Sequence, residues 1–166
     1  MNQALVEFFC YNLWANLRLI DACSKLGDLQ LDARATPTSR SVRELLAHLV
    51  GSELTFILRT KGRQHEGESR RVDPWPGFAA IREIAAETSQ ELIAIAAELV
   101  DEVEVDLPYQ GKTYRYPKRF FLLHAFEHGI EHRTEIKATL RQVEVETPDL
   151  DGWQFSEAAG FGREVP

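Results

Sequence analysis

Three histidines stand four residues apart in the segment HAFEHGIEHRTEI, which covers residues 124–136. At about 100° per residue on a helix, His124, His128 and His132 fall within a narrow arc, and Glu135 falls on the same side. Histidines four residues apart on one helical face can direct two ring nitrogens at one metal ion, as in helical zinc-protease motifs. The spacing therefore predicts a metal site on this helix. Two ligands do not hold a metal firmly, so we expect a third from another helix.

The candidate for the third ligand is His48, in the middle of the segment ELLAHLVGSEL. A lone histidine this close to an apolar stripe is more often a hydrogen-bonded core residue. Because a second helix carries two further histidines, a role as metal ligand becomes the favoured interpretation of His48. We predict a mononuclear site held by His48, His128 and His132, and we assign no role to His65.

Three imidazoles without thiolates suit zinc, nickel, copper, cobalt or iron(II). We expect one divalent ion, with zinc or nickel preferred and iron or cobalt as alternatives. Three protein ligands leave at least one coordination position open, which is the arrangement of catalytic rather than structural zinc sites. A thiol or water in that position would have its pKa lowered and could act as a nucleophile.

Four polar residues near the predicted site have roles that the sequence leaves open. Glu135 and His124 lie on the correct face to orient an imidazole through its second nitrogen. Glu135 could instead be a general base, a direct ligand or a solvated surface residue. Asn12 and Asn16, one turn apart near the start of the chain, indicate either buried hydrogen bonding or a pocket wall, and we favour the structural role.

The composition indicates one ordinary globular domain across residues 1–166, with 44% hydrophobic and 27% charged residues. The net charge of −7 argues against a general nucleic-acid binder. One basic cluster stands out in a polar stretch, and it consists of Arg59, Lys61, Arg63, Arg70 and Arg71. It predicts a solvated loop, and the alternative is a patch that steers an anionic cosubstrate.

The two cysteines, Cys10 and Cys23, fall in one predicted helix, roughly 20 Å apart and too far for a disulfide. A chain without disulfides fits a reducing cytoplasm. The N-terminal segment lacks a basic leader and a small-residue cleavage site, and polar residues interrupt it. We therefore predict a cytoplasmic protein with neither a signal peptide nor a membrane span.

Apolar residues at helical spacing predict four long helices, over residues 3–26, 42–61, 78–99 and 117–142. Ser41, with Glu44 three residues on, forms a capping-box pattern at the start of the second helix. Four long helices in one small domain predict an all-α fold, a four-helix bundle.

Two further segments lie outside these helices. Alternating residues on either side of Gly111 predict a short β-hairpin before the last helix. Pro117 then suits the first turn of that helix. From Glu144 onward the chain is rich in Gly, Pro and Asp, and we expect an irregular tail that packs through Trp153 and Phe155.

Four stretches in this order resemble the DinB-like family, also called the DinB/YfiT-like metalloenzymes: YNLWANLRLID, LLAHLVGSE, HAFEHGIEHRTEI and DLDGWQFSEAAG. The resemblance implies a four-helix bundle with a divalent metal on His48, His128 and His132. His124 matches a histidine often found one turn earlier and is not carried over as a ligand. The family commonly reads His-Arg-Gly-Gln after the last ligand, whereas here a carboxylate, Glu135, replaces the amide.

The resemblance also implies a homodimer for many members. Leu123, Phe126 and Ile130 fall opposite the predicted histidine face. These apolar residues are compatible with a subunit contact and equally with burial inside the bundle.

The resemblance implies an enzyme whose metal activates a thiol or water against a small electrophilic substrate. Related families include thiol S-transferases and isomerases that use low-molecular-weight thiols, and a hydrolase is the nearest variant. The competing hypothesis is a non-catalytic metal sensor, store or stress-linked interaction module. In that case a fourth protein ligand, Glu135 or His124, is expected to close the site. Neither nucleic acid nor membrane is an expected partner.

Overall fold

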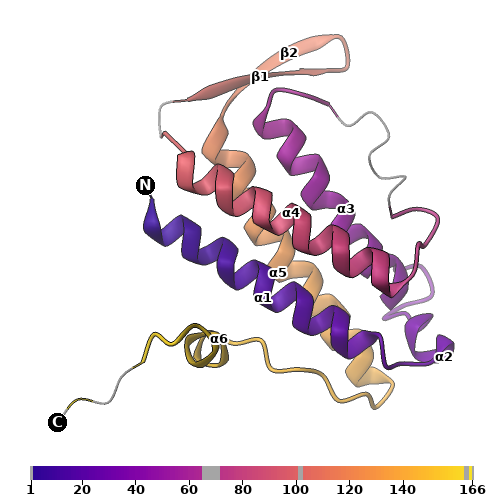
Figure 1. Ribbon diagram of the computed structural model, residues 1–166. Coiled ribbons are helices and arrows are strands. Elements are labelled where there is room, and N and C mark those ends of the chain that lie inside the picture. The colour runs from indigo at the N-terminus through magenta and orange to yellow at the C-terminus, as the bar shows by residue number, and fades with distance from the viewer. Residues whose placement is uncertain (1, 65–71, 101–102, 163–164, 166) are drawn as a thin grey trace.

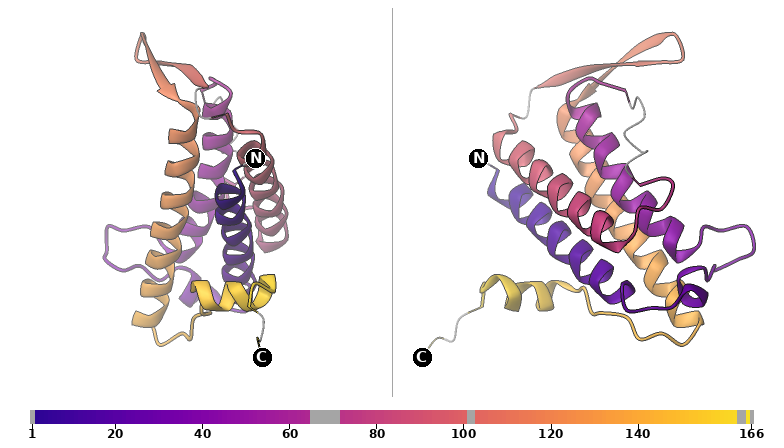
Figure 2. Two further views of the ribbon diagram at one scale, coloured as in Figure 1. Left: turned by 90° about the vertical axis from the view of Figure 1, so that its left-hand side faces the viewer. Right: turned by 45° about the vertical axis from the view of Figure 1, so that its right-hand side comes forward.

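The structure is a computed structural model that describes residues 2–64, 72–100, 103–162 and 165. Four long helices pack lengthwise into a bundle, as predicted, with a small β-hairpin at one end (Figure 1). The helices are α1 (Gln3–Cys23), α3 (Val42–Thr60), α4 (Phe78–Glu98) and α5 (Lys118–Gln142). In this arrangement α1 packs along α4, and α3 packs along α5 (Figure 2).

The predicted capping box fixes the start of α3. The Ser41 hydroxyl accepts a hydrogen bond from the Glu44 N–H (3.2 Å), and the Glu44 carboxylate accepts one from the Ser41 N–H (2.7 Å). Both donors would otherwise lack a partner inside the helix. By contrast, α1 ends at Cys23, before the predicted Leu26, and a one-turn helix, α2 (Asp28–Leu31), follows it.

The predicted hairpin is confirmed. Strands β1 (Glu104–Tyr109) and β2 (Lys112–Pro117) pair antiparallel. The two residues between them, Gln110 and Gly111, both have positive φ angles, which is typical of the tight turn that suits the twist of a hairpin. Pro117 ends β2 and caps α5, so it lies just before the first helical turn in which it was predicted.

The C-terminal segment differs from the prediction of an irregular tail. A short helix, α6 (Gly152–Ala159), begins where the Asp151 carboxylate accepts a hydrogen bond from the Gln154 N–H (2.8 Å). Phe155 packs against Tyr11 and Trp14 of α1, with ring centroids 5.6 Å apart in both pairs. Trp153 is 81% exposed, so the prediction that it anchors the tail was wrong.

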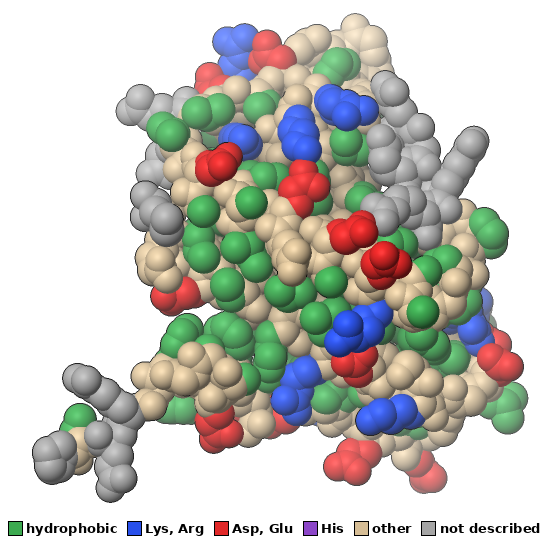
Figure 3. Space-filling model, in the orientation of Figure 1, with side chains coloured by type: hydrophobic (Ala, Val, Ile, Leu, Met, Phe, Trp, Pro, Cys, Tyr) green, Lys and Arg blue, Asp and Glu red, His purple; other side chains and the backbone are tan. Residues whose placement is uncertain are grey.

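The core holds two buried clusters that join the long helices. The larger includes Leu45 and Leu49 of α3 with Ile136 and Leu140 of α5. This packing between α3 and α5 fixes the two helices that carry the candidate ligands. In the described part of the chain, Figure 3 shows no histidine on the face presented there, where apolar and charged side chains are interspersed.

The remaining sequence predictions have mixed outcomes. Cys10 and Cys23 are free, as expected. Phe126 packs against Phe8 and Phe9, whereas Leu123 and Ile130 are 64% and 42% exposed and are not buried within the bundle.

The basic cluster is only partly described, because Arg70 and Arg71, like His65, lie outside the described residues. Lys61 and Arg63 are exposed, as a solvated loop requires, whereas Arg59 lies within α3 and is half-buried. Among the described helices, none is long and apolar enough to cross a membrane.

Candidate metal centre

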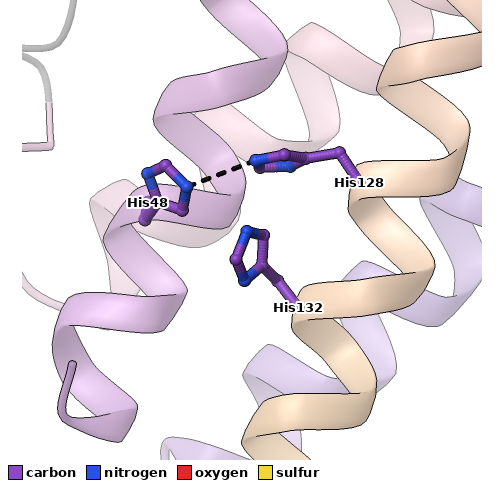
Figure 4. Close-up of side chains that lie close together, drawn as sticks. All are labelled: His48, His128 and His132. Atoms are coloured by element: carbon purple, nitrogen blue, oxygen red, sulfur yellow. Dashed lines mark hydrogen bonds between the residues drawn. The ribbon is translucent and has the colours of Figure 1, made fainter. Parts of the chain in front are cut away.

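Three histidines from two helices meet at one point between α3 and α5 (Figure 4). His48 comes from the middle of α3, and His128 and His132 come from successive turns of α5. One ring nitrogen from each lies within 4.8 Å of the others, so the group can hold a metal ion. The structure thus brings together the three residues that the sequence singled out.

The spacing of the ring nitrogens fits a metal ion. His48 Nε2 lies 3.2 Å from His128 Nε2. Two nitrogens bound to zinc at about 2.0–2.1 Å, at a tetrahedral angle, would lie about 3.3–3.4 Å apart. The observed separation is therefore close to the one that such an ion requires.

Burial keeps two of these imidazoles neutral. Desolvation, aided by the positive charge of Arg40, lowers the pKa of His48 to about 4. Desolvation, together with the neighbouring histidines, lowers the pKa of His128 to about 3. Both imidazole rings are therefore uncharged at neutral pH, and each has a nitrogen lone pair available to a cation.

Glu135 contacts the third histidine from one turn further along α5. Its Oε2 lies 3.0 Å from His132 Nδ1. If this nitrogen donates its proton to the carboxylate, Nε2 is left free as the binding atom. A carboxylate at this place can thus fix both the tautomer and the orientation of the ring.

His124 does not belong to the group of histidines whose ring nitrogens converge. Its ring packs at a tilt against Phe56 (4.6 Å between centroids) and lies 6.2 Å from the ring of His128. In the described part of the chain, neither His124 nor Glu135 joins His48, His128 and His132 as a fourth convergent residue.

A cavity of about 670 Å³ runs along the face of α3 that carries His48, and both His48 and His128 line it. Its lining also includes Val72 and Trp75, from the segment before α4. Gly51 lets Val72 lie against α3, because a Cβ there would lie only 2.8 Å from Val72 Cγ2. The histidines therefore open onto a space large enough for a small molecule.

A buried polar network joins α5 to α1, α3 and α4, and the sequence analysis pointed to it only through Asn12 and Asn16. Asn12 and Asn16 donate to the Glu53 carboxylate (2.6 and 2.9 Å) and accept from Arg133 Nη1 (2.6 and 2.7 Å). Thr88 also donates to Glu53. This is the buried hydrogen bonding favoured for the two asparagines, and it links α1, α3, α4 and α5.

Neither Glu53 nor Arg133 was singled out from the sequence, although both are 3% exposed. The available signal was a charged residue inside an apolar stretch of α3. Desolvation raises the pKa of Glu53 and lowers that of Arg133. Because Arg133 follows the candidate ligand His132 directly, the network fixes α5 beside the site.

The fold and the site together define a class: a four-helix bundle whose second and fourth long helices, α3 and α5, bring three histidines together beside one open cavity. The sequence matches the DinB family over residues 1–164, and the chain belongs to that family. No curated protein sequence matches it.

Solved structures share the fold. A DinB-like protein from Bacillus cereus ATCC 10987 superposes with a TM-score of 0.66 at 20% identity, covering 90% of this chain and 99% of the other. The DinB-like protein YjoA from Bacillus subtilis gives a TM-score of 0.62 at 18% identity, covering 89% and 97%. At these identities the likeness concerns the fold.

Proposed function

We propose that His48, His128 and His132 bind one divalent metal ion. The observation that carries this proposal is the 3.2 Å separation of two neutral ring nitrogens from different helices. Zinc or nickel is preferred, because imidazoles suit both, and iron(II) or cobalt is the alternative. Glu135 orients His132 and holds its tautomer, as carboxylates do for metal-binding histidines.

We further propose that the protein is a metal-dependent enzyme of the thiol S-transferase or hydrolase type. A divalent ion on three imidazoles would lower the pKa of a thiol or water and so supply a nucleophile at neutral pH. The cavity supports catalysis rather than storage, because it gives a small molecule access to His48 and His128. A closed site would instead need a fourth protein ligand.

The test is a pair of activity assays on zinc- and nickel-loaded protein. One follows the substitution of chloride in 1-chloro-2,4-dinitrobenzene by a thiol, which releases chloride and a proton, and the other follows hydrolysis of p-nitrophenyl acetate. We expect one of these reactions above the background rate, and we expect it to disappear in His128→Ala. Equal rates for the loaded wild type and His128→Ala would contradict the enzyme proposal and leave the sensor or store as the function.

The homodimer, the single domain and the cytoplasmic location stay predictions. The exposed Leu123 and Ile130 on α5 are the surface to test for subunit contact. A dimer on size-exclusion chromatography with light scattering, converted to monomer by Leu123→Glu, would support a homodimer that forms through this surface.

A further inference from the structure

We propose that the substrate of this site carries a carboxylate and that Arg40 binds this group while the reacting end of the molecule lies at the histidines. This inference rests on the proposed function and narrows its substrate class to small organic anions. It is argued from the cavity, from the pairing of the charges along its wall and from the position of Arg40 on α3.

Arg40 lies at the end of the cavity nearest the start of α3. It lines the same cavity as His48 and His128 and directly precedes Ser41, the N-cap of α3. His48 lies seven residues beyond Ser41, roughly 10 Å along the helix axis at 1.5 Å per residue. One small molecule can therefore contact both the Arg40 side chain and the histidines.

Arg43 and Glu44, which also line this cavity, already have partners. Arg43 donates to Asp28 (2.7 Å) and Asp32 (3.0 Å). Glu44 pairs with Arg34 (2.8 Å) and also caps α3. Their charges are therefore largely compensated within the protein.

Arg40 differs from these residues. Among the residues that the structure describes, no carboxylate forms an ion pair with it, and its side chain is exposed. Its side chain lines the same cavity as those of His48 and His128. The cavity that His48 and His128 line thus contains a cation with no ion-pair partner among the described residues.

A carboxylate is the ligand chemistry that fits this cation. A guanidinium presents paired N–H donors that match the two oxygens of a carboxylate. The chain as a whole carries a net charge of −7, so an anion needs a local positive group to approach it. The capped N-terminus of α3 offers no equivalent site, because Ser41 and Glu44 already use its first donors.

Arg59 provides a matched control at the other end of the same cavity. It lines the cavity and lies over the ring of Phe56, 5.8 Å from the centroid. It is eleven residues from His48, roughly 16 Å along the axis. Replacing it removes the same charge from the same cavity, but at the opposite end of α3 from Arg40 and further along the helix axis from His48.

The experiment measures binding of two thiols of equal length to the cobalt(II)-loaded protein. The probes are 6-mercaptohexanoate and its neutral analogue 6-mercaptohexan-1-ol, and the readout is the change in cobalt absorption during titration. We expect the carboxylate to bind about tenfold more tightly than the alcohol. Arg40→Ala should remove this preference, Arg40→Lys should restore part of it, and Arg59→Ala should keep it within about twofold.

The outcomes separate this inference from the function on which it rests. If both thiols bind but Arg40→Ala changes neither affinity, the inference is wrong and the thiol-binding site stands. If neither thiol alters the cobalt spectrum, the proposed thiol chemistry is overturned and the inference with it. Equal loss of preference in Arg40→Ala and Arg59→Ala would also contradict it, because the effect would then be that of net charge alone.

Discussion

His48 Nε2 and His128 Nε2 lie 3.2 Å apart, although the residues are 80 positions apart in the chain and belong to different helices. Burial keeps both rings neutral, and the cavity gives access to both. Two neutral imidazoles this close can share one hydrogen bond or together bind a cation. The third histidine, within 4.8 Å, favours the cation.

Glu135 should affect metal affinity without being essential for it. Glu135→Ala removes the partner of His132 Nδ1, and loss of such a partner costs about tenfold or more in metal affinity. Glu135→Gln keeps an acceptor and restores the family's amide, so we expect a smaller loss. Chelator competition gives both affinities, with the exposed Glu131→Ala as control. An unchanged affinity in Glu135→Ala would show that the carboxylate plays no part.

The metal-free protein should lose stability in mild acid because two of its partly buried histidines have lowered pKa values. The pKa values are about 4 for His48 and about 3 for His128 in the folded state, against about 6.5 in an unfolded chain. Between these values the unfolded chain binds more protons, so the free energy of unfolding falls as the pH is lowered from about 6.5 toward 4.

This pH dependence is measured by urea unfolding of chelator-treated protein at pH 7 and pH 5. We expect wild type to lose more free energy of unfolding between these pH values than His128→Ala, which lacks one of the two groups. Identical losses in the two proteins would contradict the lowered pKa of His128.

Glu53 should be a major contributor to stability. Glu53→Ala leaves Arg133 buried without the carboxylate that its asparagine partners also contact. Breaking a buried charge network by removing one partner costs about 3–5 kcal/mol. Urea denaturation measures the loss, with the exposed Glu83→Ala expected within about 0.5 kcal/mol of wild type. A loss in Glu53→Ala no larger than that of the control would rule out the network as a stabilising feature.

Gly129 should not tolerate a methyl group. A Cβ there would lie 2.7 Å from Asn12 Oδ1 and 2.9 Å from Arg133 Nη1. The crowding should cost about 1–3 kcal/mol, more than the gain of about 1 kcal/mol that alanine brings to a helix. Gly152→Ala, where nothing lies within 4 Å, is the control and should be neutral or slightly stabilising. A more stable Gly129→Ala would show that the network can move aside.

The fold was predictable because its signals are local. Helical spacing, the Ser41–Glu44 capping box and the turn at Gly111 each act within a few residues. The missed helix α6 also had local signals, since Asp151 caps its start and Gly160 ends it in a left-handed conformation. The Gly- and Asp-rich composition of the tail outweighed them in the prediction.

The candidate site was predictable in part, for the same reason. His128 and His132 share a helical face by spacing alone, and His48 was found because it is a histidine near an apolar stripe. The link from Glu53 to Arg133 depends on how four helices are arranged, so no short segment encodes it. The position of Arg40 at the cavity likewise depends on tertiary structure.

The most direct test of the central claim is the metal content of untagged protein, measured by elemental mass spectrometry for wild type, His48→Ala and His128→Ala. The three-histidine centre predicts about one divalent ion per chain in wild type and its loss in both variants. Wild type that holds no metal, even after reconstitution with zinc, nickel and iron(II), would contradict it. The three histidines would then be hydrogen-bonded core residues. The proposal of a metal-dependent enzyme would be excluded as well, because it depends on the metal ion.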